Sequence, residues 1–337
     1  MAGFEELEAQ DPRQVGRYRI VARLGAGGMG RVYLGRSPGG RAVAVKVVRP
    51  ELAEDGEFRR RFGREVAAAR RVNGIFTAGV VDADPDGPLA WLATAYMPGI
   101  SLGEAVSEHG PWPPSSVLAL RAALAEALEA IHAAEVIHRD LKPSNVLLAA
   151  DGPRVIDFGI SVAGEDSKLT RTGMTIGTPG FMSPEQITGK PVGPASDVFS
   201  LGAVLAFTAT GTGPFGTDSA HVLYFRTVYE EPDLQALPPD LREIVGSCLA
   251  KDPDQRPTVP MLLDHLAEAA GGERASTQVL TGTAWLPEPV VRTIHQRTTP
   301  PHHPSSPPPS QPDTVQADPP SPAPLATVPA QPPSPQD

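Results

Sequence analysis

The sequence predicts an α+β protein in which a strand-rich first lobe with one helix precedes a mainly helical second lobe. Three observations support this prediction. Short runs of β-type residues separated by turns fill the first part of the 337-residue chain, one stretch with helical spacing interrupts them, and long Ala/Leu-rich stretches dominate the middle. Strands and helices that segregate in this way indicate an α+β architecture, and a ligand is expected in the cleft between the lobes.

Both ends of the chain are expected to lie outside the folded part. Residues 1–17 show no clear strand or helix pattern, so they are predicted to form a flexible leader. From Pro287 onward the chain holds 17 of its 39 prolines. Such a composition buries too little apolar surface to offset the entropy of ordering, so residues 273–337 are predicted to be a disordered, proline-rich tail.

Strands of the first lobe are expected at residues 18–24, 31–34, 42–48, 79–83 and 89–95. A turn rich in glycine, from Gly25 to Gly30, joins the first two strands. Glycines at this density allow backbone amides to approach a phosphate, although a plain glycine-rich hairpin remains the alternative. A dinucleotide-binding fold would place a helix after the turn. Here β-type residues follow, which favours a strand–loop–strand lid.

Lys46 lies inside an apolar strand, where a charge is costly unless it is paired. The helix expected over residues 55–72 carries Glu65 beside its apolar stripe. An ion pair between Lys46 and Glu65 would keep the lysine charged and aim it at phosphates, whereas an exposed lysine on an edge strand is the alternative.

The first lobe is expected to end at residue 96, and the helical lobe to cover residues 97–272, beginning with helices at 101–109 and 113–134. The sequence Met97-Pro98-Gly99 breaks the strand pattern, so residues 95–99 are the candidate hinge between the lobes.

The segment from His138 to Asn145 places a carboxylate, an ammonium and an amide, those of Asp140, Lys142 and Asn145, in a polar stretch interrupted by proline. It is interpreted as a functional loop. Asp157 follows twelve residues after Asn145, so the two oxygen ligands are expected to meet across a short hairpin. Such ligands suit magnesium, which indicates phosphoryl transfer.

The composition excludes several classes of protein. A formal charge of −10 argues against general binding of nucleic acid or anionic membranes. The single cysteine, Cys248, excludes an intrachain disulfide. The acidic N-terminus has no signal-peptide pattern, and no apolar stretch reaches the ~20 residues of a membrane helix. A cytoplasmic protein without a membrane segment is expected.

Together these motifs resemble the protein-kinase set in order and spacing. They are Gly25-x-Gly27-x-x-Gly30-x-Val32, Val43-Ala-Val-Lys46, Glu65, His138-Arg-Asp140-x-Lys142-x-x-Asn145, Asp157-Phe-Gly159 and Ser183-Pro-Glu185. The resemblance covers residues 18–270 and points to the bacterial eukaryotic-like (Hanks-type) serine/threonine kinases. It implies a bilobal protein-kinase-like fold over residues 18–272 and an ATP-dependent protein serine/threonine kinase.

The resemblance also implies roles for individual residues. Asp140 would orient the substrate hydroxyl and take its proton, Lys142 would offset charge on the transferred phosphoryl group, and Asn145 and Asp157 would hold Mg²⁺ or Mn²⁺. A small gatekeeper, Thr94, would leave a rear pocket open. The residues expected to bind ATP are Leu24, Gly25, Ala26, Gly27, Gly28, Met29, Gly30, Val32, Ala44, Lys46, Glu65, Thr94 and Tyr96.

Residues 159–183 would form the activation segment. Within it, Thr170 and Thr172 are the expected autophosphorylation sites, and Arg139 would pair with the added phosphate. Further along the chain, Asp197 would support the backbone of the catalytic loop, and Glu185 would form a buried ion pair with Arg256. His138 is expected to pack and not to react.

Two other readings of the same fold remain open: a catalytically weak pseudokinase that acts as a scaffold, and a small-molecule phosphotransferase. The presence of Lys46, Asp140 and Asp157 argues against the first, and Arg139 with residues 183–185 argues against the second. The expected partners are protein substrates, a transient homodimer for trans-autophosphorylation, and a proline-reading partner of the tail. A solvated linker is the alternative for that tail.

Overall fold

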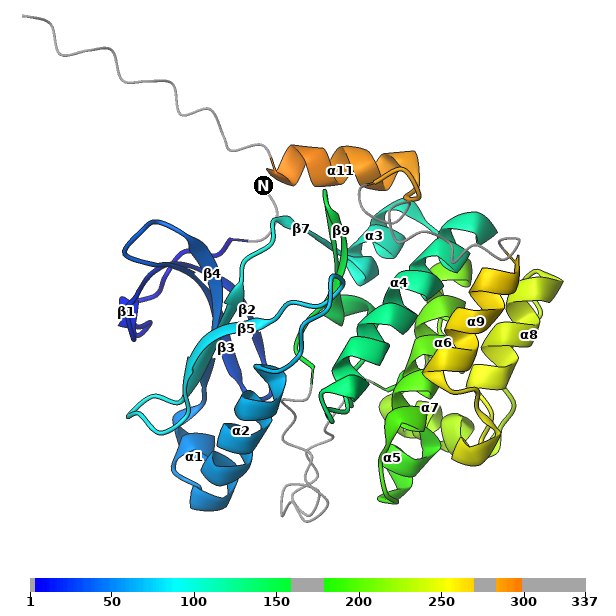
Figure 1. The fold of residues 1–337 in the computed structure, drawn as a ribbon, viewed down its shortest axis with the longest axis horizontal. Coiled ribbons are helices and arrows are strands. Elements are labelled where there is room, and N and C mark those ends of the chain that lie inside the picture. Colours follow the sequence, from blue (N-terminus) through cyan, green and yellow to red (C-terminus); the bar gives the residue numbers. More distant parts are fainter. Residues whose placement is uncertain (1–3, 159–178, 270–282, 299–337) are drawn as a thin grey trace, which may run out of the picture. The chain divides into compact units, whose positions relative to one another are not determined.

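The first lobe is built on one antiparallel sheet of six strands (Figure 1). The computed structural model describes residues 4–158, 179–269 and 283–298, and it confirms the predicted α+β class. The strands pair in the order β1-β2-β3-β4-β6-β5. They are β1 (Gln14–Val15), β2 (Tyr18–Gly27), β3 (Gly30–Arg36), β4 (Ala42–Val48), β5 (Val80–Asp84) and β6 (Trp91–Ala95).

The alternation of side chains along β4 separates a packed face from a face that is open to the second lobe. Val43 and Val45 are buried in a cluster with Tyr18, Tyr33 and Trp91. Because neighbouring strand residues point to opposite faces, Ala44 and Lys46 lie on the other side of the sheet. Two of the predicted ATP-binding residues are thus brought to one face by the period of the strand.

The single long helix of this lobe is α2 (Gly56–Ala69), preceded by the short helix α1 (Pro50–Ala53). Asp55 caps α2, since its Oδ1 accepts from the amides of Glu57 and Phe58 at 2.8 and 3.2 Å. The stripe expected from the helical spacing is buried, and Arg70 follows as the C-cap, so the helix ends slightly earlier than predicted. The buried residues are Phe58, Phe62, Val66 and Ala69.

The second lobe is mainly helical. A small sheet of β7 (Gly99–Ser101), β8 (Val146–Ala149) and β9 (Gly152–Val155) lies at its border with the first lobe. Helix α6 packs against α4 and α8, and most of its side chains are buried, which makes it the centre of this lobe. The helices are α3 (Leu102–His109), α4 (Pro114–Ala133), α5 (Pro184–Thr188), α6 (Pro194–Thr210), α7 (Ala220–Tyr229), α8 (Pro239–Cys248) and α9 (Val259–Ala269), with 3-10 turns at Pro143–Asn145 and Pro253–Gln255.

The prediction of a flexible leader over residues 1–17 is wrong for the residues that the structure describes. Residues 14–15 pair with β2, and Asp11 is only 4% exposed. The Asp11 carboxylate accepts from Arg23 at 2.9 Å and from the Tyr33 hydroxyl at 2.8 Å. Burial alone would raise the pKa of Asp11, but these hydrogen bonds lower it to about 2. A buried, charged anchor therefore holds this segment to the sheet.

The prediction that residues 273–337 are disordered is wrong for residues 283–298. They include helix α11 (Glu288–Thr298), which packs against β7 and α3 (Figure 1). Trp285 meets Trp112 edge to face at 6.0 Å, and Val290 and Ile294 are fully buried. The prediction used the average composition of the whole tail, and the prolines concentrated further along the chain dominate that average. Residues 299–337 lie outside the described part.

No helix among the described residues is long and apolar enough to cross a membrane. Cys248 is a buried free thiol on α8, and burial raises its pKa to about 12, so it stays protonated at neutral pH.

Candidate active site

The loop that carries Asp140 is held in place by the buried carboxylate of Asp197 on α6. Its Oδ2 accepts from the amide of His138 at 2.8 Å, and its Oδ1 accepts from the amide of Arg139 at 2.9 Å. His132, at the end of α4, lies 2.7 Å from Oδ2 through its Nε2. Arg139 itself has a positive φ of 67°, which a non-glycine residue adopts only when its surroundings enforce it. Asp197 therefore fixes an otherwise unfavourable loop backbone, as predicted.

The side chains of this loop converge on Asp140. Its Oδ2 lies 2.8 Å from Lys142 Nζ and accepts from Asn145 Nδ2 at 3.2 Å. Asn145 Nδ2 also donates to the backbone carbonyl of Asp140 at 2.8 Å. The three functional side chains predicted from the sequence thus form one hydrogen-bonded group, with the carboxylate oriented from two sides.

A hairpin brings Asp157 beside this group. Strands β8 and β9 pair Val146 with Val155, and the amide of Ile156 donates to the carbonyl of Asn145 at 2.9 Å. Asn145 directly precedes the first strand of the hairpin, and Asp157 follows the second strand by two residues. Both residues therefore lie at the open end of the hairpin. The hairpin therefore brings Asn145 next to Ile156, the residue that precedes Asp157.

Lys46 crosses from the first lobe to Asp157. Its Nζ lies 3.1 Å from Asp157 Oδ2, and the lysine side chain is 15% exposed. Asp157 has a positive φ of 58°, so its backbone is also in a strained conformation. A lysine from the sheet and a carboxylate from the helical lobe that is predicted to bind metal thus share one site.

Glu65 has a different partner from the one that the sequence predicted. Its Oε1 lies 3.5 Å from Arg139 of the catalytic loop, while Lys46 pairs with Asp157. The expected Lys46–Glu65 ion pair is therefore absent from this arrangement, because both groups have found partners across the lobe boundary. Burial raises the pKa of Glu65 to about 7, despite the opposing charges of Arg139, Arg61 and Arg64.

The glycine-rich turn connects β2 and β3, with Gly27 paired to Gly30. A Cβ added at Gly25, Gly27 or Gly28 would meet no neighbouring atom, whereas one at Gly30 would overlap the carbonyl oxygen of Val47. Gly30 is therefore required for the packing of the strands. The other three glycines leave room over the turn, which fits a loop that lies close to phosphates.

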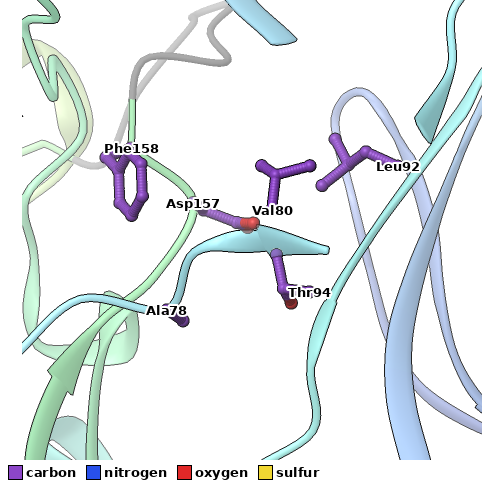
Figure 2. Close-up of a pocket in the computed structure, with 6 residues that line it drawn as sticks. All are labelled: Ala78, Val80, Leu92, Thr94, Asp157 and Phe158. Carbon is purple, nitrogen blue, oxygen red and sulfur yellow. The ribbon is translucent and has the colours of Figure 1, made fainter. Parts of the chain in front are cut away.

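The rear pocket expected behind Thr94 is present but small. It is a cavity of about 10 Å³ between the sheet and the segment after β9 (Figure 2). A cavity of that size holds roughly one water molecule. The residues that line it are Ala78, Val80, Leu92, Thr94, Asp157 and Phe158.

The remaining predicted site residues lie either on or beside the sheet or outside the described part of the chain. Leu24 and Ala26 lie on β2 and Val32 on β3, while Tyr96 follows β6 directly. Met29 is at the tip of the β2–β3 turn, and its carbonyl accepts from the amide of Arg49. Thr170 and Thr172, with the rest of residues 159–178, lie outside the described part of the chain.

Several polar residues near the site have a structural role. Arg256 donates to both oxygens of Glu185 at 2.7 and 2.9 Å, and both residues are buried, as predicted. The His138 ring is fully buried and meets the ring of Phe158 at 6.4 Å. Burial lowers the pKa of His138, so it is neutral and packs. Sequence reasoning missed the contact of His132 with Asp197, for which the only signal was a histidine in the last turn of a buried helix.

The donor set fits a divalent cation bound together with a nucleotide. Among the described residues, no group of three or more His, Cys, Asp or Glu side chains is arranged so that it could hold a metal ion. A cation held by Asp157 and Asn145 would therefore take its other ligands from phosphate oxygens and water, which is the coordination that Mg²⁺ favours.

Comparisons with known proteins agree with this geometry. The family model described as "Protein kinase domain" matches residues 18–266. The probable serine/threonine-protein kinase PkwA of Thermomonospora curvata is 55% identical over 270 residues, which are 80% of this chain and 36% of that protein. The serine/threonine-protein kinase AfsK of Streptomyces griseus is 50% identical over 299 residues, 87% of this chain and 36% of that protein. The chain thus spans about a third of the length of these relatives.

A solved structure shows the same fold. The kinase domain of Mycobacterium tuberculosis PknI superposes with a TM-score of 0.60 at 29% identity, over 76% of this chain and 96% of that domain. Fold and sequence therefore agree on a bilobal protein-kinase fold. The chain belongs to the protein kinase family, and its relatives confirm the resemblance to the bacterial eukaryotic-like serine/threonine kinases. Membership of this family implies the use of ATP and a divalent metal.

Proposed function

We propose that this chain is an ATP-dependent protein serine/threonine kinase that phosphorylates its own activation segment. The observation that carries the proposal is the convergence of Lys46, Asp157, Asn145 and Asp140 from two lobes into one site. The names of its relatives support serine and threonine as the accepting residues.

The proposed chemistry assigns one task to each side chain. Asp140 aligns the hydroxyl of the substrate and accepts its proton as the oxygen attacks the γ-phosphorus and the bond to the β-phosphate oxygen breaks. Lys142, 2.8 Å from Asp140, offsets negative charge on the transferred group. Lys46 binds the α- and β-phosphates, and the open glycines of the β2–β3 turn cover them. Asn145 and Asp157 would hold Mg²⁺ or Mn²⁺, which neutralises phosphate charge when bound.

The pairing of Glu65 with Arg139 supports a regulated enzyme. Phosphate added at Thr170 or Thr172 would compete for Arg139, because a phosphate carries more charge than a carboxylate. Glu65, freed from Arg139, would then be available to Lys46, and Asp157 would be released to bind metal. In this proposal, two ion pairs between the lobes exchange partners when the segment is phosphorylated.

The test is transfer of label from γ-labelled ATP to the purified protein, with Mg²⁺ and Mn²⁺ in separate reactions. Incorporation on threonine that is lost in Asp140→Asn supports the proposal, and mass spectrometry assigns the sites. If the wild type incorporates no phosphate and Asp140→Asn behaves identically, kinase activity is excluded and a pseudokinase scaffold is the function that remains. We further propose protein substrates, a transient homodimer for trans-autophosphorylation, a proline-reading partner of residues 299–337, and a cytoplasmic location.

A further inference from the structure

The two lobes are joined by a short connection between β6 and β7, and both ends of the described chain reach it. Residues 96–98 form this connection. The ring of Phe4, near the N-terminus, lies 6.3 Å from the ring of Tyr96. Helix α11, near the other end, packs against β7, the strand that leaves the connection. Segments almost three hundred residues apart in sequence therefore converge on one hinge.

Helix α11 is firmly seated beside this hinge. Val290 and Ile294 are fully buried, and the Thr293 hydroxyl lies 2.9 Å from His109 Nε2 at the end of α3. At the other end of α11, Arg297 Nη1 lies 3.4 Å from Glu104 Oε1. Glu104 in turn accepts from the amide and hydroxyl of Ser101, the residue that joins β7 to α3. Arg297 thus reaches the hinge through the cap of α3.

Tyr96 is the first residue of the connection between the lobes. Burial raises the pKa of its hydroxyl, and the charge of Arg297 acts in the opposite direction. The family match ends at residue 266, so α11 and Phe4 both lie outside the part that the kinase family shares. Two segments beyond the ends of the family match therefore meet at the hinge.

We propose that Phe4 and Arg297 clamp Tyr96 and the hinge, and that Arg297 is a positioning residue for the nucleotide. This inference depends on the nucleotide site of the proposed function. A nucleotide held between two lobes must fix their separation, and a hinge that is already ordered lowers the entropic cost of that step. The clamp therefore strengthens nucleotide binding and leaves the chemical step unchanged.

The experiment compares the 337-residue wild type with Arg297→Ala, Phe4→Ala and a matched control, Arg292→Ala. Arg292 lies on the same helix and pairs with Glu288 in an exposed contact, away from the hinge. ADP affinity is measured by calorimetry, and KM for ATP and kcat by phosphate transfer. We expect Arg297→Ala to weaken ADP binding and raise KM about threefold, the scale of a partly exposed ion pair, with kcat unchanged. Arg292→Ala should match wild type.

Hydrogen exchange of a peptide covering residues 95–101 provides a readout that does not depend on activity, and it should be faster in Arg297→Ala and Phe4→Ala. If ADP affinity and hydrogen exchange at the hinge are the same in Arg297→Ala as in wild type, the clamp is refuted. The proposed kinase function is unaffected by that result. If kcat falls with KM unchanged, the clamp is likewise refuted. Wild type that binds no ADP would overturn the nucleotide site itself, and the clamp with it.

Discussion

Lys46 and Glu65 belong to the same lobe, yet each pairs with a residue of the other. Lys46 contacts Asp157 and Glu65 contacts Arg139, so two ion pairs bridge the lobes where one pair within the first lobe was expected. A buried carboxylate is destabilised by the loss of its hydration unless a cation lies close to it. Which cation becomes the partner depends on which one the fold places within reach. At 3.5 Å, Arg139 compensates Glu65 only in part, which agrees with the raised pKa of its carboxyl group.

The ionisation of Glu65 should destabilise the protein at neutral pH. Its pKa is 4.5 in the unfolded reference and about 7 in the fold, so the folded state binds the extra proton. Stability is then full below pH 4.5 and falls as pH rises towards 7, by up to about 3 kcal/mol. Glu65→Gln removes this loss. The free energy of unfolding in urea, measured at pH 5 and pH 8, should fall less in Glu65→Gln than in wild type.

Glu57→Gln is the matched control, because Glu57 lies exposed in the first turn of the same helix. It should follow the pH dependence of wild type. Equal pH dependence in wild type and Glu65→Gln would show that Glu65 titrates normally and that its pairing with Arg139 is stronger than the structure indicates.

At the scale of elements, the Glu185–Arg256 pair links α5 to the turn before α9. Burial alone would raise the pKa of Glu185, but hydrogen bonds from Arg256 and Ser196 lower it. Arg256→Met should cost about 3–5 kcal/mol, because it leaves a buried carboxylate without its cation. The double variant Glu185→Gln/Arg256→Met should cost less than Arg256→Met. Chemical unfolding of the three proteins gives the comparison.

The same pair sets a pH dependence of opposite sign to that of Glu65. A lowered folded pKa means that the stabilisation is present above the unfolded value of 4.5 and is lost as pH falls through the folded value. Wild type should therefore lose more stability on acidification below pH 4.5 than the double variant. Identical acid profiles, or a double variant as unstable as Arg256→Met, would show that the pair is not a stabilising link.

The glycine-rich turn separates a packing role from a binding role. Gly30→Ala would drive a Cβ into the carbonyl of Val47, so it should lower thermal stability sharply, on the order of 2 kcal/mol or more. Gly28→Ala, with open space around it, should leave the melting temperature within a few degrees of wild type and raise KM for ATP. If the two variants melt alike, the crowding at Gly30 has been relieved by movement of the strands.

The sequence predicted the elements and the catalytic loop well, because each rests on local pattern: β-type runs, helical spacing, and motif residues close together in the chain. It failed at several contacts between distant segments for which no motif gave a signal. Asp11 finds partners in Arg23 and Tyr33 on strands that its own segment does not specify. The choice of Arg139 over Lys46 as the partner of Glu65 depends on how the lobes meet. Helix α11 was missed because the prediction used the average composition of residues 273–337, in which the many prolines outweigh the apolar residues of this short segment.

At the scale of the whole molecule, the proposed mechanism requires the two inter-lobe ion pairs to separate. Asp157 cannot give its full charge to a metal while Lys46 holds it at 3.1 Å, and Glu65 cannot reach Lys46 while it pairs with Arg139. Contacts between lobes of this kind shift as a set, since each group that is released needs a new partner. Activity should therefore depend on whether the enzyme has already been phosphorylated, as well as on its concentration.

Dephosphorylated protein should accordingly show a lag when it is mixed with ATP and a peptide substrate. The lag reflects the time in which Thr170 and Thr172 gain phosphate and draw Arg139 away from Glu65. Pre-incubation with ATP should abolish it, and it should shorten as the enzyme concentration rises if one molecule phosphorylates another. A double variant, Thr170→Ala/Thr172→Ala, should stay at the initial slow rate throughout. A linear time course from the start in the dephosphorylated wild type would mean that the ion pairs exchange without phosphate, driven by nucleotide alone.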